Sequence, residues 1–251
     1  MPGASQFMFG SGLLYGTRTD TANNTPRLFG TMQDVSIDFD GEIKELFGQF
    51  TFPVDVARGK TKISGKAKFA TVAGEIYNDL FFGQTLTTGQ EAFAYQEAHT
   101  IPAPAGPYTV QVANHTLVPL TDLGVTYQST GQPLTLVTAL TGAGQYEWAP
   151  STGTYTFDSA DASVPVFINY LYTAATGTQL AVNNPFMGTT PRFSAVFAET
   201  FESQQVVFTL LNCVASKLMF STKIDDYTIP EMDFSAFANA AGNVGTLSFA
   251  N

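Results

Sequence analysis

The sequence predicts a mainly β fold of the sandwich or barrel type with one short helix, and three features support this prediction. Short apolar runs alternate with clusters of turn residues along most of the chain. Only one segment repeats its apolar residues at helical spacing. The 251 residues suffice for one large β domain or two small ones, and we expect a single domain spanning residues 1–251.

Residues 1–31 predict an extended N-terminal arm with little structure of its own. The segment is rich in glycine, threonine and asparagine, which favour loops over regular elements. Its aromatic residues are isolated from one another, and they are Phe7, Phe9, Tyr15 and Phe29. We therefore place the start of the β core at residue 32 and its end at residue 228.

Two strands at the start of this core each have one strongly charged face. The first strand alternates apolar and acidic residues, and the second alternates small or apolar residues with lysines. If the two strands pair in one antiparallel sheet, their charged faces can lie on the same side, where each opposite-charge pair contributes about 0.2–1 kcal/mol. The alternative is two solvated faces without any partner relation. The acidic face comprises Asp34, Ser36, Asp38, Asp40 and Glu42, and the lysine face comprises Lys60, Lys62, Ser64, Lys66 and Lys68.

Residues 71–82 predict the helix. Val72, Ile76 and Leu80 form one apolar stripe, Thr71 is a suitable N-cap, and Gly83 is a natural C-terminal stop. A helix of about three turns is not stable alone in water, so we expect the stripe to pack on a sheet.

The rest of the chain predicts further short strands and a second arm. Residues 84–121 form a loop region of uncertain structure, because their first part fits neither a helical nor a strand period. Strand-like runs begin near the end of this region with YTVQVAN and continue with LGVTYQ and VPVFINYLYT, and TGAGQYEWAPSTGTYTF predicts a hairpin. Residues 190–223 supply two or three more strands. Residues 229–251, which contain Phe234 and Phe237, predict an extended C-terminal arm.

Composition excludes several classes of protein. The net charge of −10 and the pI of about 4.4 argue against a protein that grips nucleic acid, which needs a basic surface. The single cysteine, Cys213, excludes a disulfide framework within the chain. The N-terminus lacks the pattern of a secretory signal, and no apolar run approaches the ~20 residues that span a bilayer. We expect a soluble protein, made in a reducing cytoplasm, that does not insert into a membrane.

No catalytic signature is present in the sequence. His99 and His115 have no histidine or cysteine at metal-ligand spacing, and no nucleophile–base motif surrounds them. We therefore expect a structural protein rather than an enzyme, with no catalytic, cofactor-binding or metal-binding residues. Tyr146, Trp148 and Tyr155 are the only candidate for a sugar-binding platform, and ordinary cross-strand packing is the alternative explanation for them.

Three stretches of the chain resemble the major tail tube proteins of long-tailed bacteriophages of the siphovirus type. They are FPVDVARGKTKISGKAKFATVAGEIYNDLFFG, the segment from DLGVTYQ to VFINYLYT, and KIDDYTIPEMDFSAFANAAGNVGTLSFAN. The resemblance covers residues 30–83, 122–173 and 217–251, which is more than half of the chain.

The resemblance implies a fold of two packed antiparallel sheets with one flanking helix and extended terminal arms. It also implies hexameric rings whose sheets join into a β-barrel around a lumen, with rings stacked through both arms and a long loop. DNA would pass through the lumen without specific binding. The expected partners are other copies of the chain and the tape measure, terminator and distal tail proteins. The expected location is the virion tail, assembled in the host cytoplasm.

Residues on the arms and charged faces are the expected assembly contacts. A tail-completion or baseplate-hub ring protein of the same fold is one alternative. A β-sandwich module that binds a ligand or carbohydrate is another. The expected contacts are Phe7, Phe9, Tyr15, Phe29, Lys60, Lys62, Lys66, Lys68, Asp38, Asp40, Glu42, Phe234 and Phe237.

Overall fold

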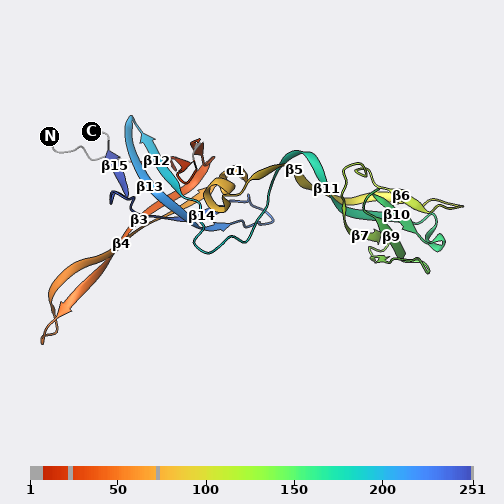
Figure 1. The fold of residues 1–251 in the computed structure, drawn as a ribbon, viewed down its shortest axis with the longest axis horizontal. Coiled ribbons are helices and arrows are strands. Elements are labelled where there is room, and N and C mark those ends of the chain that lie inside the picture. The colour runs from red at the N-terminus through yellow and green to blue at the C-terminus, as the bar shows by residue number, and fades with distance from the viewer. Residues whose placement is uncertain (1–7, 22–24, 72–73, 250–251) are drawn as a thin grey trace. The chain divides into compact units, whose positions relative to one another are not determined.

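The chain forms two compact units (Figure 1). A computed structural model describes residues 8–21, 25–71 and 74–249. Unit 1 comprises Met1–Leu86 and Leu180–Asn251, and unit 2 comprises Thr87–Gln179. Each unit has its own cluster of buried apolar residues. The sequence predicted one domain, whereas the described residues form a unit 2 that is inserted into the chain of unit 1.

Unit 1 is built on an eight-stranded sheet in which every pair of neighbouring strands is antiparallel. The strand order is β2-β1-β12-β13-β14-β4-β3, and β15 pairs with β13 beside this path. The mainly β class with antiparallel sheets and a short helix is confirmed. The strands are β1 (Leu13–Arg18), β2 (Arg27–Leu28), β3 (Met32–Phe47), β4 (Pro53–Phe69), β12 (Phe193–Phe201), β13 (Gln204–Met219), β14 (Glu231–Ala236) and β15 (Gly245–Phe249).

A short helix covers the apolar face of this sheet. It begins as α1 (Gly74–Tyr77) and continues as a π-helical turn, η1 (Asn78–Phe82). Ile76 and Leu80 join the core of unit 1, as the predicted stripe requires, while Val72 lies outside the described residues. Gly83 ends the helix with φ 64°, and its N–H donates to the Asn78 carbonyl at 2.6 Å. The predicted glycine stop is therefore confirmed.

The core of unit 1 lies between the helix and the sheet and depends on aromatic packing. Phe193 and Phe234 are fully buried, with ring centroids 5.9 Å apart. Gly65 on β4 lies directly opposite Phe234 on β14. A Cβ at Gly65 would come within 2.1 Å of the Phe234 ring, so only glycine leaves room for this ring.

Both predicted arms contribute strands to the sheet, which corrects the sequence analysis. In the N-terminal segment β1 pairs with β12, and Leu14 and Phe29 are buried in the core. In the C-terminal segment β14 lies between β13 and β4, and β15 pairs with β13. These strands are short and interrupted by glycine and polar residues, so their pattern suggests loops. Pairing with strands distant in sequence decides their structure.

Unit 2 consists of two further sheets over a shared core. A four-stranded sheet has the order β6-β10-β9-β8, and a three-stranded sheet has the order β5-β11-β7. The region predicted as an uncertain loop, 84–121, contains β5 and β6, and the predicted hairpin is β9–β10. The elements are β5 (Leu86–Thr100), β6 (Thr109–Gln111), β7 (Thr121–Tyr127), β8 (Thr135–Leu136), β9 (Gln145–Ala149), β10 (Thr154–Phe157), the 3-10 turn η2 (Ser159–Asp161) and β11 (Pro165–Leu180).

Buried tyrosine hydroxyls in unit 2 donate to carboxylates. Asp122 accepts from Tyr146 at 2.6 Å and from Tyr155 at 2.9 Å, and Glu97 accepts from Tyr170 at 2.6 Å. Burial raises the pKa of Tyr170 to about 12, so this phenol stays protonated and keeps donating at neutral pH. These bonds satisfy polar groups that would otherwise be costly to bury.

Charge is distributed unevenly between the units. Unit 2 contains none of the 11 lysines and arginines of the chain but six of its 21 acidic residues. Unit 1 therefore carries every lysine and arginine that could form an ion pair. Among the helices of the described residues, none has the length and apolar character that would let it cross a membrane.

We predict that Phe234→Ala lowers the free energy of unfolding of unit 1 by about 3–5 kcal/mol, because the ring is only 1% exposed and no neighbour can fill its space. Chemical denaturation followed by circular dichroism measures the loss. The only tryptophan, Trp148, lies in unit 2, so its fluorescence transition should not move. Phe186→Ala, at a ring that is 92% exposed, is the control and should change stability by less than about 0.5 kcal/mol. Equal effects of the two changes would contradict the assigned core.

Candidate assembly surface

The far half of the β3–β4 hairpin extends beyond the rest of the sheet (Figure 1). β14 pairs with β4 only from Ile63 to Lys68. Residues 40–47 and 53–62 pair only with each other within the described chain. We call residues 40–62 the ribbon. A two-stranded hairpin without a third strand or a covering layer is marginally stable in water.

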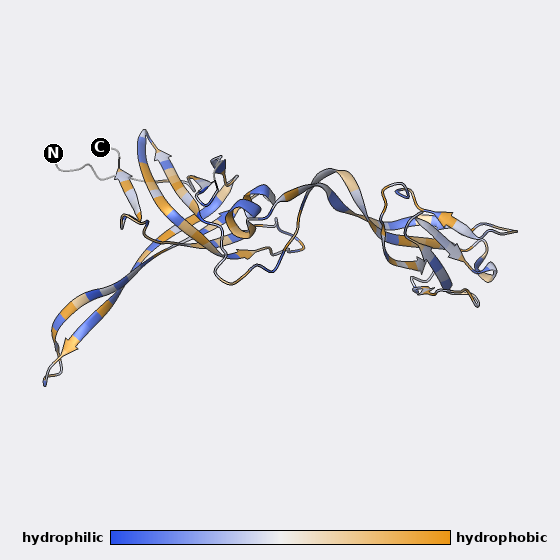
Figure 2. Ribbon diagram, in the orientation of Figure 1, coloured by the Kyte–Doolittle hydropathy of each residue, from blue (hydrophilic) through white to orange (hydrophobic). Residues whose placement is uncertain are grey.

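One face of the ribbon carries exposed apolar side chains and continues the face that forms the core. Val35 and Ile37 on β3 pack against the core, and the same side of the strand carries Ile43 and Phe47 further out. On β4, Val56 and Arg58 lie on this side, opposite Glu45 and Ile43, so two charged residues interrupt the apolar side chains. Ile43 is 65% exposed and Val56 is 53% exposed. Hydrophobic and hydrophilic residues alternate along both strands in Figure 2. We call this side the apolar face of the ribbon.

The opposite side of the same two strands is charged. Asp34 lies opposite Lys68, and Asp40 lies opposite Lys62, as the predicted antiparallel pairing requires. Lys68 Nζ is 3.4 Å from Asp34 Oδ2. Further out on β3, Lys44 forms an ion pair with Glu42. The prediction that acidic and lysine faces share one side of a sheet is confirmed.

A buried glutamate on β14 extends this charged side across the sheet. Lys66 Nζ lies 2.5 Å from Glu231 Oε1, and Lys217 Nζ on β13 lies 3.4 Å from the same oxygen. The hydrogen bond from Lys66 lowers the pKa of Glu231 below its ordinary value, and the same bond raises the pKa of Lys66. Sequence reasoning missed Glu231, because only strand order brings it between two lysines.

The structure separates the predicted phenylalanine contacts into two groups. Phe29 and Phe234 are buried in the core of unit 1, where they support the fold and offer no surface for assembly. Phe9 is exposed and lies 5.8 Å from the ring of Phe201. Phe237 is half-buried beneath the guanidinium of Arg192, at 5.4 Å. Phe7 lies outside the described residues.

The other predicted contacts lie on exposed strands. Tyr15 points outward from β1 and remains partly exposed. Lys60, Lys62 and Asp38 are exposed, and none of them forms an ion pair with another described residue. Ser64 lies opposite Asp38, so β4 offers this carboxylate no cation. Their role in assembly stays a prediction.

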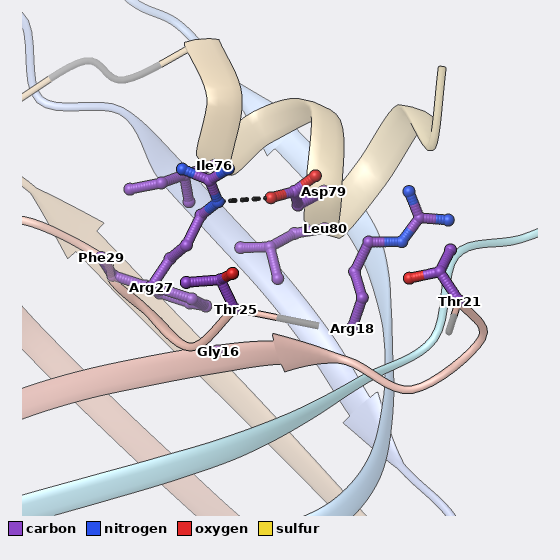
Figure 3. Close-up of a pocket in the computed structure, with 9 residues that line it drawn as sticks. All are labelled: Gly16, Arg18, Thr21, Thr25, Arg27, Phe29, Ile76, Asp79 and Leu80. Carbon is purple, nitrogen blue, oxygen red and sulfur yellow. Dashed lines mark ion pairs between the residues drawn. The ribbon is translucent and has the colours of Figure 1, made fainter. Parts of the chain in front are cut away.

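A pocket of about 240 Å³ lies between β1, β2 and the helix (Figure 3). Two arginines reach it, and each already has carboxylate partners. Arg27 Nε lies 2.7 Å from Asp79 and the same guanidinium pairs with Glu75, while Arg18 pairs with Asp20 at 2.9 Å. The ion pairs of Arg27 link the helix to β2. Because the carboxylates already neutralise both arginines, the pocket does not favour the binding of an anion.

The remaining candidate sites have structural roles. Tyr146 and Tyr155 are buried, so they cannot form an exposed sugar platform with Trp148. His99 Nε2 lies 2.6 Å from Glu97, and His115 Nδ1 lies 2.9 Å from the Val112 carbonyl. In the described part of the chain, no three metal-ligating side chains gather at a possible metal site.

Comparisons with known proteins give no further identification. No protein family matches the chain, and a search of the curated proteins finds no match.

We predict that Glu231→Gln destabilises unit 1 at pH 7 and has progressively less effect in acid. The lowered pKa of Glu231 means that its ion pairs stabilise the fold above the ordinary carboxyl pKa of 4.5 and are lost as pH falls through the lowered value. Urea denaturation of both proteins at a series of pH values measures the difference. Glu45→Gln on the exposed ribbon is the control. A difference that stays constant down to pH 2 would show that charge on Glu231 is unimportant.

Proposed function

We propose that this protein is a structural virion protein that self-assembles into stacked rings and forms the tail tube of a long-tailed bacteriophage, a channel for DNA delivery into the host. One observation carries the proposal. The apolar face of the ribbon continues the core side of β3 and β4 but has no cover within the described chain.

Burial against another copy would supply the missing cover. Exposed side chains on this face lose contact with water when a second molecule packs on them, which contributes about 25 cal/mol per Å² of apolar surface. Clusters of exposed apolar side chains on one surface often mark interaction sites. The resemblance to tail tube proteins, whose rings stack through a long loop, makes other copies of this chain the expected partner.

The charge of the protein supports a channel for DNA. A net charge of −10 repels phosphate, so DNA would pass without adhering to the wall. In the resembling family the rings are hexameric, and the tape measure, terminator and distal tail proteins are the further partners. The protein would be assembled in the host cytoplasm and would remain in the virion tail, without enzymatic activity.

A tail-completion or baseplate-hub ring protein is the second candidate. It would share the fold and the ribbon but would form rings that do not stack. A carbohydrate-binding module is disfavoured, because only Trp148 of the expected platform remains available at the surface of unit 2.

Negative-stain electron microscopy of the purified protein over a concentration series tests the proposal. We expect hollow tubes or stacked rings whose number rises with concentration. Single rings at every concentration would favour the completion or hub protein. Particles the size of one chain at every concentration would contradict both.

We predict that Ile43→Asp combined with Val56→Asp abolishes tubes while leaving both units folded. The two charges lie on the apolar face, outside either core, so they oppose burial against another copy without disturbing folding. Electron microscopy and circular dichroism measure the two effects.

Leu46→Asp is a matched control for this variant. Leu46 lies on the opposite side of the same ribbon, paired with Asp55, and is 61% exposed. We expect this variant to form tubes. Tubes from the double variant, or loss of tubes from both, would show that the apolar face is not the contact.

A further inference from the structure

Part of the sheet of unit 1 consists of four strands with two free edges. In order they are β3, β4, β14 and residues 213–219 of β13. β12 pairs with β13 only as far as Cys213. Within the described residues, no strand pairs with the other edge of residues 214–219 or with the outer edge of β3. Apart from the Met32 carbonyl, which accepts from Ser11 Oγ at 3.0 Å, each edge offers backbone N–H and C=O groups to an incoming strand.

Charge alternates from strand to strand across these four. On the polar side β3 is acidic, β4 carries Lys66 and Lys68, β14 carries Glu231 and Asp233, and β13 carries Lys217. The series therefore begins with an acidic strand at one free edge and ends with a basic strand at the other. A second copy placed beside the first, edge to edge, would continue the alternation without a break.

Strand direction agrees with the same placement. Neighbouring strands are antiparallel throughout, so β3 and β13 run in opposite directions. In a ring made by rotation, every β3 points the same way. An even number of strands per copy then makes β3 of one copy antiparallel to β13 of the next. The contact is head-to-tail, the type that generates a ring when the rotation between copies closes.

We propose that the free edge of β3 in one copy pairs with residues 214–219 of β13 in the next, and that Lys217 forms an ion pair with Asp38 of the incoming strand. This inference rests on the proposed function, in which copies form rings. It specifies the joint within a ring, whereas the ribbon accounts for stacking between rings.

Lys217 and Asp38 are available for this contact, because among the described residues neither has a close partner of opposite charge of its own. Lys217 lies 3.4 Å from Glu231, whose closer partner is Lys66 at 2.5 Å, so Lys217 has capacity for a second carboxylate. Asp38 faces Ser64 on β4 and has no cation there. In the cross-strand rows Lys217 aligns with Ser36, so meeting Asp38 requires a shift of two residues. A two-residue shift keeps each side chain on its face, and closed barrels require such a stagger.

A charge swap tests the ion pair. Lys217→Glu alone and Asp38→Lys alone should each reduce the yield of rings at least tenfold, and the double swap should restore it. Ring yield is counted by electron microscopy and checked by sedimentation. Lys217→Arg should assemble normally. Lys223→Glu, an exposed lysine outside these strands, is the control with the same charge change.

Disulfide trapping tests the joint independently of electrostatics. The only native cysteine, Cys213, is buried, so a Lys217→Cys, Asp38→Cys double variant offers two new accessible thiols. Under oxidising conditions it should give a ladder of covalent multimers on a non-reducing gel. Either single variant should give no ladder beyond a dimer.

The outcomes separate the two proposals. If the unmodified protein forms no rings, the proposed function fails. If it forms rings, but the single charge changes assemble normally and the cysteine pair stays monomeric, only the assigned joint is overturned. Circular dichroism of each variant excludes unfolding as the cause of lost rings.

Discussion

The position of β14 between β13 and β4 is the constraint on which the rest of unit 1 depends. This six-residue strand joins two long strands that would otherwise have no common neighbour. Its inward side supplies Met232 and Phe234 to the core, and its outward side supplies Glu231 to the lysines. Because β4 leaves β14 at Ile63, the same pairing also determines where the ribbon begins.

The long strands of unit 1 could be predicted from the local sequence, because their charged and apolar residues alternate with the period of a strand. The lysine and acidic faces alternate over many residues, so the β3–β4 pairing and its charged side follow from the sequence. The terminal segments could not be assigned in this way. Six residues around Phe234 carry too little pattern to distinguish a central strand from an arm, and their burial depends on Gly65, more than 150 positions away. The candidate surface was predicted only on its charged side. The apolar face could not be predicted, because only the structure shows that the core ends where β4 extends beyond β14.

Unit 2 could not be predicted from the sequence, for a different reason. Its first strand, β5, turns small alanines inward and large aromatics outward, which reverses the usual guide to burial. Its polar groups also pair in ways that spacing does not reveal, since Asp122 meets tyrosines from two strands further along the chain. Unit 2 has a core of its own, and these features belong to that core and its sheets.

The absence of lysine and arginine from unit 2 has a practical consequence for chemical modification of the protein. Trypsin cleaves only after basic residues, so the interval between Lys68 and Arg192 contains no cleavage site and unit 2 would be released whole. Amine-reactive dyes and cross-linkers would likewise attach only to unit 1. Labelling of lysine side chains would therefore map the surface of unit 1 and leave unit 2 unmodified.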